Sequence, residues 1–268
     1  MPTVYFSPSG AGAQTGADPA NAKAAISGGA WAAAINNDLG NGNLVALLAG
    51  TYASTTALNP GATSSLANPI AMVGCDAAGA TLQPRRLRGG RGRLDASAMP
   101  RIELAAGLQM WTSAKTHTLL HGLVVTGSVN NPLVNLSLNC SLTRCCIINA
   151  GSGTSVSCAN PSTWNAVADC DLEVTSGTYN AVLALAQICQ VRGCTVLGPG
   201  KGVAGSGNRR GIASAFGFYV NNCYVAGVAG EGLHTTHSDS IVNCSRMTVR
   251  DVGGDGIAMI NASINPHR

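Results

Sequence analysis

Residues 141–153, SLTRCCIINAGSG, place two adjacent cysteines inside an apolar run that ends in Gly-Ser-Gly. Similar segments recur before and after this stretch: LLHGLVVTG, VADCDLEVTSG, VRGCTVLGPG and VNNCYVAGVAG. The anchor residues of the repeats are separated by 24, 24, 24, 29 and 21 residues, and they are Gly122, Cys146, Cys170, Cys194, Cys223 and Cys244. A period in the low twenties, with a short strand and a Gly-rich turn in each period, predicts a parallel β-helix.

The amino-acid composition favours the same fold class. Only 10% of the residues are charged and only 4% are aromatic. A core cannot be built from large rings with this composition, so many small aliphatic side chains must be buried in a regular lattice. We therefore predict a single all-β domain.

The positions of the cysteines predict buried thiols. Because side chains alternate along a strand, Cys146 and Ile148 should point inward together, and Cys170 should do so with Leu172. Stacked rungs lie ~4.8 Å apart, which suits neither the geometry of a disulfide nor the tetrahedral convergence of a zinc site. We expect free thiols stacked along the axis and no metal site, with Cys145 as the most exposed of them.

The N-terminal segments resemble a known family. VYFSPSGAGAQTGADP, LVALLAGTY and NPIAMVG, with the Ala-rich AISGGAWAAAINNDL among them, resemble the start of right-handed parallel β-helix proteins of the pectate-lyase-like superfamily, which includes bacteriophage tailspikes and tail appendages. The resemblance implies a single-stranded right-handed parallel β-helix with a short N-terminal strand and a capping helix. It implies that residues 1–50 form that strand and cap, and that residues 51–268 form the coils.

The two ends of the chain suggest where the protein works. The chain begins MPTVYFSPSG without a signal-peptide pattern, and no run of 18 apolar residues predicts a membrane span. It ends at INPHR without a second amphipathic helix, which would leave open strand edges on the last coil. We expect a virion protein made in the host cytoplasm, with secretion as the alternative. Its C-terminal end should contact copies of itself, as in a trimer, or other virion proteins.

Candidate catalytic residues lie in DCDLEV. Asp169, Asp171 and Glu173 alternate with the inward residues and should share the outer face, with Arg192 near that face one period later. Two carboxylates on one face suit the acid and base of a glycoside hydrolase, or would hold Ca²⁺ for a lyase. A solvated acidic strand is the alternative interpretation. No cofactor is expected unless the protein is such a lyase.

A second polar cluster lies in EGLHTTHSDS. Its candidate acid–base residues are Glu231, His234, His237 and Asp239. Imidazole and carboxylate groups together suit proton transfer, although a third metal ligand at a suitable spacing is missing. A polar turn whose side chains cap backbone groups is the alternative.

Two further groups of residues predict contacts with partners. A glycan platform would use aromatic and basic side chains, and the candidates are Trp164, Tyr179, Tyr224, Lys201, Arg209 and Arg210. The spacing places Tyr224 in one row with Asp171. The segment RRLRGGRGRLDASAMPR is either a solvated loop or a docking site for an acidic partner, through Arg85, Arg86, Arg88, Arg91 and Arg93. It lacks interleaved aromatic residues, so nucleic acid is not an expected partner.

Three functions follow from these observations. We expect a virion-associated tailspike-like or tail-appendage protein that recognises a polysaccharide on the host surface. The second function is a polysaccharide lyase or glycoside hydrolase that acts on an acidic polysaccharide through the face of Asp171 and Glu173. The third is a purely structural protein of virion assembly. The sequence leaves open whether the protein is an enzyme.

Overall fold

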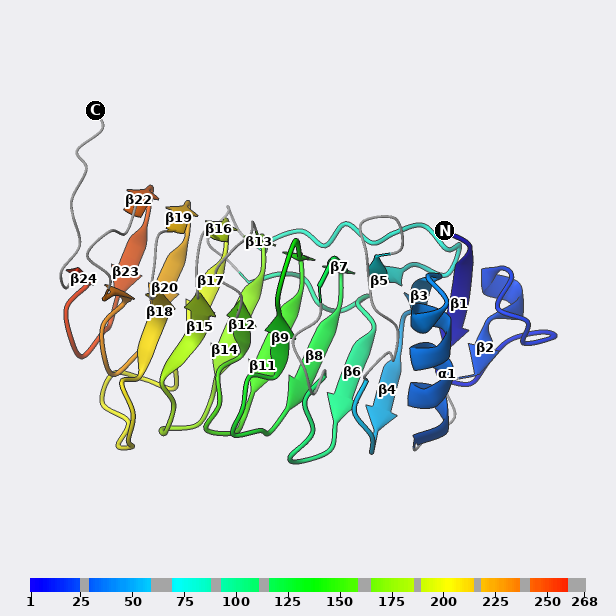
Figure 1. Cartoon of the computed structure of the whole chain (residues 1–268), viewed down its shortest axis with the longest axis horizontal. Coiled ribbons are helices and arrows are strands. Elements are labelled where there is room, and N and C mark those ends of the chain that lie inside the picture. The colour runs from blue at the N-terminus through cyan, green and yellow to red at the C-terminus, as the bar shows by residue number, and fades with distance from the viewer. Residues whose placement is uncertain are drawn as a thin grey trace.

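The computed structural model describes residues 1–24, 29–58, 69–87, 93–110, 116–158, 165–185, 189–214, 218–236 and 242–259. Within these residues, three β-sheets run along a rod, and every pairing between the named strands is parallel (Figure 1). We call them sheets A, B and C. The predicted all-β parallel β-helix is confirmed.

From β3 onward, each coil contributes at most one strand to each sheet. The described strands of sheet A are β2 (Lys23–Ala24), β1 (Thr3–Ser7), β3 (Leu44–Leu48), β5 (Ile70–Cys75), β7 (Thr118–His121), β10 (Ser141–Thr143), β13 (Asn165–Ala168), β16 (Cys189–Arg192), β19 (Phe218–Asn221) and β22 (Val242–Ser245). Those of sheet B are β4 (Thr51–Ser54), β6 (Arg101–Leu104), β8 (Val124–Gly127), β11 (Cys146–Asn149), β14 (Asp171–Val174), β17 (Thr195–Leu197), β20 (Tyr224–Ala226) and β23 (Thr248–Arg250). Those of sheet C are β9 (Val134–Leu136), β12 (Val156–Cys158), β15 (Ala181–Leu185), β18 (Arg210–Ser214), β21 (Leu233–Thr235) and β24 (Ile257–Met259).

The core consists of rows of like aliphatic residues that stack from coil to coil. The inward row of sheet A is Val45, Met72, Leu120, Leu142, Val167, Val191 and Val220. That of sheet B is Ile102, Val125, Ile147, Leu172, Val196 and Val225. Burying a side chain of this size stabilises the fold by about 1.5–3 kcal/mol, so these rows hold the coils in register.

The predicted capping helix is also present. α1 (Gly29–Gly40) packs against β3, β4 and β5 at the end of the rod that carries the N-terminus (Figure 1). Ala32, Ile35 and Leu39 lie on one face of the helix and are fully buried. A short 3₁₀ turn, η1 (Pro19–Asn21), precedes it. No helix in the described part of the chain is long and apolar enough to cross a membrane.

A two-residue corner joins sheet A to sheet B in successive coils. The first corner residue is left-handed, with φ of 65° at Gly122, 51° at Arg144, 55° at Asp169, 63° at Gly193 and 53° at Asn222. The second residue points into the core, and at four successive corners it is Cys145, Cys170, Cys194 or Cys223, each at most 2% exposed. Each of these thiols donates a hydrogen bond to the carbonyl oxygen two residues earlier, over 3.2–3.4 Å.

The prediction that Cys146 and Ile148 point inward is wrong, and so is the prediction that Cys145 is exposed. The left-handed residue is Arg144, so Cys145 and Ile147 face the core. Cys146 faces outward and is nevertheless buried. It packs against Leu94, which belongs to the segment between β5 and β6 that lies over the outer face of sheet B. All ten cysteines are free thiols, and nine of them are buried.

We expect Cys244 to react with iodoacetamide before the other thiols. Cys244 is only half-buried, whereas burial raises the pKa of Cys145 and of Cys146 to about 12 and that of Cys244 to about 11. Because the thiolate is the nucleophile, alkylation should begin at Cys244 and accelerate as the pH rises. Peptide mass spectrometry of briefly labelled native protein checks the order, with Cys244→Ser as the control that removes the fast site. Equally fast labelling of Cys145 would contradict the corner geometry.

Candidate functional site

A long segment between β5 and β6 leaves the coil and lies along the rod. In Figure 1 it is the cyan trace that runs from β5 past β7. We call its described parts, residues 82–87 and 93–100, the strap. The two parts pair in antiparallel fashion, because the amide of Leu87 donates to the carbonyl of Arg93 over 2.8 Å and the amide of Asp95 donates to that of Arg85 over 2.8 Å.

The underside of the strap is apolar and covers the outer face of sheet B. Leu94 and Met99 are each 4% exposed, and they pack against Val124 and Cys146 of that face. A sheet face that would otherwise be wet is therefore dry under the strap. This burial changes the environment of every polar side chain at the edge of the covered area.

Arg86 anchors the strap to two successive coils. Its Nη1 donates hydrogen bonds to Asp171 Oδ1 and to Thr195 Oγ1, each over 2.8 Å. Its Nη2 donates to the carbonyl of Cys170 over 3.1 Å and to that of Gly193. The side chains of Arg86 and Asp171 are only 11% and 9% exposed. An ion pair this dry is stable only when further hydrogen bonds reach both charged groups, as they do here.

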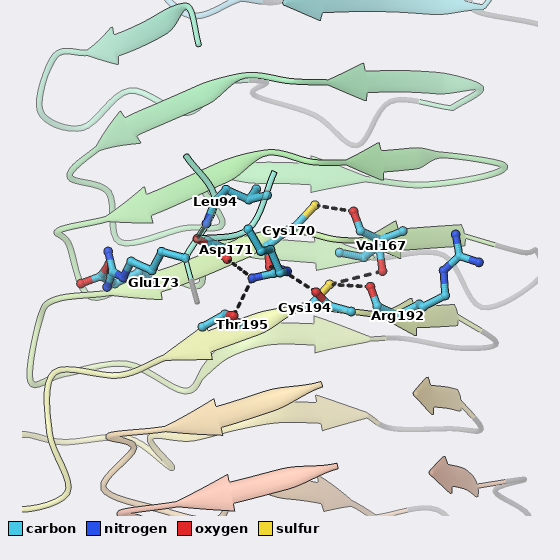
Figure 2. Close-up of polar contacts among 12 residues, drawn as sticks. Leu94, Val167, Cys170, Asp171, Glu173, Arg192, Cys194 and Thr195 are labelled. Atoms are coloured by element: carbon cyan, nitrogen blue, oxygen red, sulfur yellow. Dashed lines mark hydrogen bonds and ion pairs between the residues drawn. The ribbon is translucent and has the colours of Figure 1, made fainter. Parts of the chain in front are cut away.

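The strap also donates hydrogen bonds to the second carboxylate oxygen of Asp171 and to Glu173, the next acidic residue of β14. The backbone amide of Leu94 donates to Asp171 Oδ2 over 2.7 Å. Arg93 Nη2 donates to Glu173 Oε2 over 2.7 Å, in a more exposed ion pair. Figure 2 shows Leu94, Asp171 and Thr195 around these contacts. Both oxygens of Asp171 are thus bound within the protein, which leaves neither of them to act on a substrate.

The other predicted catalytic residues lie apart from this pair. Asp169 is the left-handed corner residue between β13 and β14, and it lies before the face formed by Asp171 and Glu173. Arg192 is at the end of β16 in sheet A, and in Figure 2 its side chain points away from Asp171. The structure therefore brings Asp171 and Glu173 to one face, as predicted, but does not bring Arg192 to it.

A cleft of about 350 Å³ opens on sheet B beside Thr195, the residue that Arg86 of the strap contacts. The register of the strands places Asp171, Thr195, Tyr224 and Thr248 in one outward row, so the predicted row of Tyr224 is confirmed. The strap covers this row as far as Thr195. The polar and aromatic lining of the cleft is Thr195, Asn222, Tyr224, Arg246 and Thr248.

The lining combines a ring with several hydrogen-bonding groups. The ring of Tyr224 is half-buried, while Asn222 and Arg246 are exposed. Among the described residues Arg246 forms no ion pair. Hydroxyl, amide and guanidinium groups around one aromatic ring suit a polar ligand that carries many oxygens.

Asn222 and Arg246 were not predicted from the sequence as site residues. Both are left-handed corner residues, with φ of 53° each, directly before an inward residue. The sequence contains a pattern that identifies them. Asn222 directly precedes the inward Cys223 and Arg246 directly precedes the inward Met247, just as Asp169 precedes Cys170. The repeat of the cysteines was used only to predict which residues point inward. The residues directly before those cysteines were therefore not recognised as a row of corner residues.

Most of the other predicted glycan-binding residues do not lie in the cleft. Tyr179 is 1% exposed, and its hydroxyl donates to the carbonyl of Arg209 over 3.1 Å, so it offers no surface to a glycan. Lys201 pairs with Asp251 over 3.1 Å on the surface, and Arg210 pairs with Glu231 over 3.0 Å. Arg209 donates to the carbonyl of Val203 over 3.0 Å. Trp164 lies outside the described residues.

The second polar cluster is only partly described. His234 lies on β21 and is 1% exposed; burial, and then the charge of Arg210, lower its pKa. Burial of Glu231 opposes its ionisation, but hydrogen bonds from its own backbone amide and from Arg210 lower its pKa. His237 and Asp239 lie outside the described residues. No group of three or more acidic, histidine or cysteine side chains in the described part of the chain could hold a metal ion.

The arginines predicted to dock a partner have different environments. Arg86 and Arg93 bind carboxylates of the same chain, so these two guanidinium groups already have partners within the protein. Arg85 is exposed, and Arg88 and Arg91 lie outside the described residues.

Comparisons with known proteins give little further guidance. No protein-family model matches the chain, and no curated protein matches it in sequence. Among solved structures, the crystal structure of pectate lyase Pel9A is similar, with a TM-score of 0.47 and 11% sequence identity over 95% of this chain and 79% of that chain. Likeness at this level assigns no function to the residues of the cleft.

We expect Asp171→Ala to lower the free energy of unfolding by about 3 kcal/mol, because it leaves the buried guanidinium of Arg86 without its carboxylate. The matched control is Glu173→Ala, which removes the exposed ion pair with Arg93 and should cost no more than about 1 kcal/mol. Urea unfolding followed by circular dichroism measures both values. Equal losses in the two variants would show that the pair under the strap is not specially anchored.

Proposed function

We propose that the protein recognises a polysaccharide through the cleft on sheet B. The observation that carries the proposal is the grouping of Tyr224, Asn222, Arg246 and two threonines where the strap ends. A sugar presents apolar ring faces and a rim of oxygens, and the cleft offers an aromatic ring together with hydroxyl, amide and guanidinium groups.

The proposed polysaccharide is acidic. Arg246 supplies a positive charge at the cleft, and the formal net charge of the whole chain is +4. A guanidinium group forms paired, charge-assisted hydrogen bonds with carboxylate or sulfate oxygens. The affinity should accordingly fall as salt is added, because the cleft is exposed to solvent.

The proposal is recognition and not cleavage. The pair suggested as acid and base, Asp171 and Glu173, is held by Arg86, Arg93 and the amide of Leu94. A hydrolase needs both carboxyl groups at the scissile bond. The lyase or hydrolase alternative therefore lacks its main candidates on this face. Depolymerisation of a bound acidic polysaccharide would restore it.

We place this recognition on a virion, in a tailspike-like or tail-appendage protein that binds a polysaccharide of the host surface. The support is the resemblance of the N-terminal segments to such proteins, together with the rod shape and the capping helix at one end (Figure 1). A purely structural assembly protein remains the competing assignment. The two differ in whether the isolated protein binds a glycan.

We expect the protein to bind polygalacturonate, and Tyr224→Ala to weaken that binding about tenfold through loss of the ring contact. Isothermal titration calorimetry measures the affinity, with alginate and hyaluronate as further anionic polymers and dextran as the neutral comparison. The matched control is Tyr219→Ala, which removes a tyrosine from β19 in sheet A, away from the cleft.

The salt dependence is part of the same test. Binding should weaken on addition of 1 M NaCl in the parent and change less with salt in Arg246→Gln. Failure to bind any of the anionic polymers, or equal binding by the parent and Tyr224→Ala, would remove the proposed function and leave the structural role.

A further inference from the structure

Thr195 lies on the boundary between the strap and the cleft. Its side chain is 4% exposed, and it belongs both to the cleft lining and to the contacts of Arg86. The guanidinium Nη1 donates to the Thr195 hydroxyl oxygen over 2.8 Å and to Asp171 Oδ1 over the same distance. Thr195 is therefore a buried polar group at the base of an open cleft, and the strap controls one side of it.

The hydrogen bond from Arg86 restricts what the hydroxyl of Thr195 can do. A hydroxyl group has one hydrogen to donate and two lone pairs to accept with. Arg86 occupies one lone pair, and its positive charge repels the hydroxyl hydrogen. No acceptor for that hydrogen is found within the part of the chain that the structure describes. Thr195 lines the cleft, so a ligand bound there can accept this hydrogen.

We propose that Arg86 is a positioning residue for the cleft and that Thr195 is its specificity-determining donor. The proposal rests on the proposed function. Arg86 binds no ligand itself, but it holds the Thr195 hydroxyl so that a bound sugar must present an acceptor oxygen at that point. A ligand group that only donates can bind the second lone pair of the hydroxyl, but the buried hydroxyl hydrogen is then left without a partner, which is penalised.

The ion pair with Asp171 gives the arrangement its rigidity. The Nη2 atom of Arg86 donates to the carbonyls of Cys170 and Gly193, which belong to successive corners of the coil. The guanidinium is thus fixed by backbone as well as by side chains. Its orientation toward Thr195 does not depend on whether the cleft is occupied, so the donor is set before a ligand arrives.

A double-mutant cycle tests the proposal, with polygalacturonate as the probe in calorimetry. Thr195→Val should weaken binding about tenfold, and Thr195→Ser should keep it within about threefold, because only serine retains the hydroxyl. The pair Arg86→Gln with Asp171→Asn removes both buried charges together, so that neither is left unpaired. It should weaken binding about tenfold in the parent and cause no further loss when combined with Thr195→Val.

The control is the pair Arg93→Gln with Glu173→Gln, which neutralises the other strap ion pair without contacting Thr195. It should leave the affinity unchanged. If the Arg86–Asp171 pair does not fold, Arg86→Lys replaces it in the cycle, because a lysine keeps the charge but cannot reach all four acceptors at once. Thermal unfolding of every variant confirms that the folded state is compared.

The outcomes separate this inference from the proposed function. Suppose that Arg86→Gln with Asp171→Asn lowers the affinity equally in the parent and in Thr195→Val. That result would mean that the strap affects the cleft independently of Thr195, and the positioning role of Arg86 would be wrong. Unchanged binding in Thr195→Val, with weakened binding in Tyr224→Ala, would overturn the inference and leave glycan recognition intact. Unchanged binding in both variants, or no binding by the parent, would overturn glycan recognition and this inference with it.

Discussion

The structure depends on the parallel register between successive coils. Each strand pairs with its equivalent in the next coil, and side chains at equivalent positions stack. A slip of one residue would turn every inward side chain of a strand outward, so the buried rows fix the register strongly. At the corners from Gly122 to Arg246 the left-handed residue keeps this register through the turn from sheet A to sheet B, because it brings the next residue into the core.

The same register creates the outward row on which the candidate site is built. Asp171, Thr195, Tyr224 and Thr248 are equivalent positions in four successive coils, yet their environments differ. The strap makes the first of them part of a dry ion pair, and the last two remain accessible. One long excursion therefore divides a uniform sheet face into a closed part and an open part. The site is defined as much by where the strap ends as by the residues of the coils.

The sequence allowed the fold to be predicted more fully than the site. The architecture could be predicted from the period of about 24 residues and from the Ala-rich helix, because both are local patterns in the sequence. The prediction of which residues point inward around Cys146 was wrong by one residue. It assumed unbroken alternation of side chains, and the left-handed corner interrupts that alternation. Two adjacent cysteines hid that interruption, because either of them could fill the inward position.

The contacts of the strap could not be predicted from spacing. Arg86 and Asp171 are 85 residues apart, and Arg86 and Thr195 are 109 apart, so no periodic pattern links them. The arginine-rich segment was accordingly interpreted as either a solvated loop or a docking site for an acidic partner. Tyr179 was assigned to a glycan platform for a similar reason: its burial depends on a long loop of the following coil, where its hydroxyl binds the carbonyl of Arg209.

These long separations also affect how the chain reaches its final structure. The coils require only contacts between neighbouring repeats, which can form progressively along the rod. The anchor of Arg86 needs acceptors from two different coils, both formed by sequence far beyond the strap itself. Closure of so long a loop carries an entropic cost that is met only when those acceptors are already in place. We therefore expect the strap to dock late in folding, after the central coils have assembled.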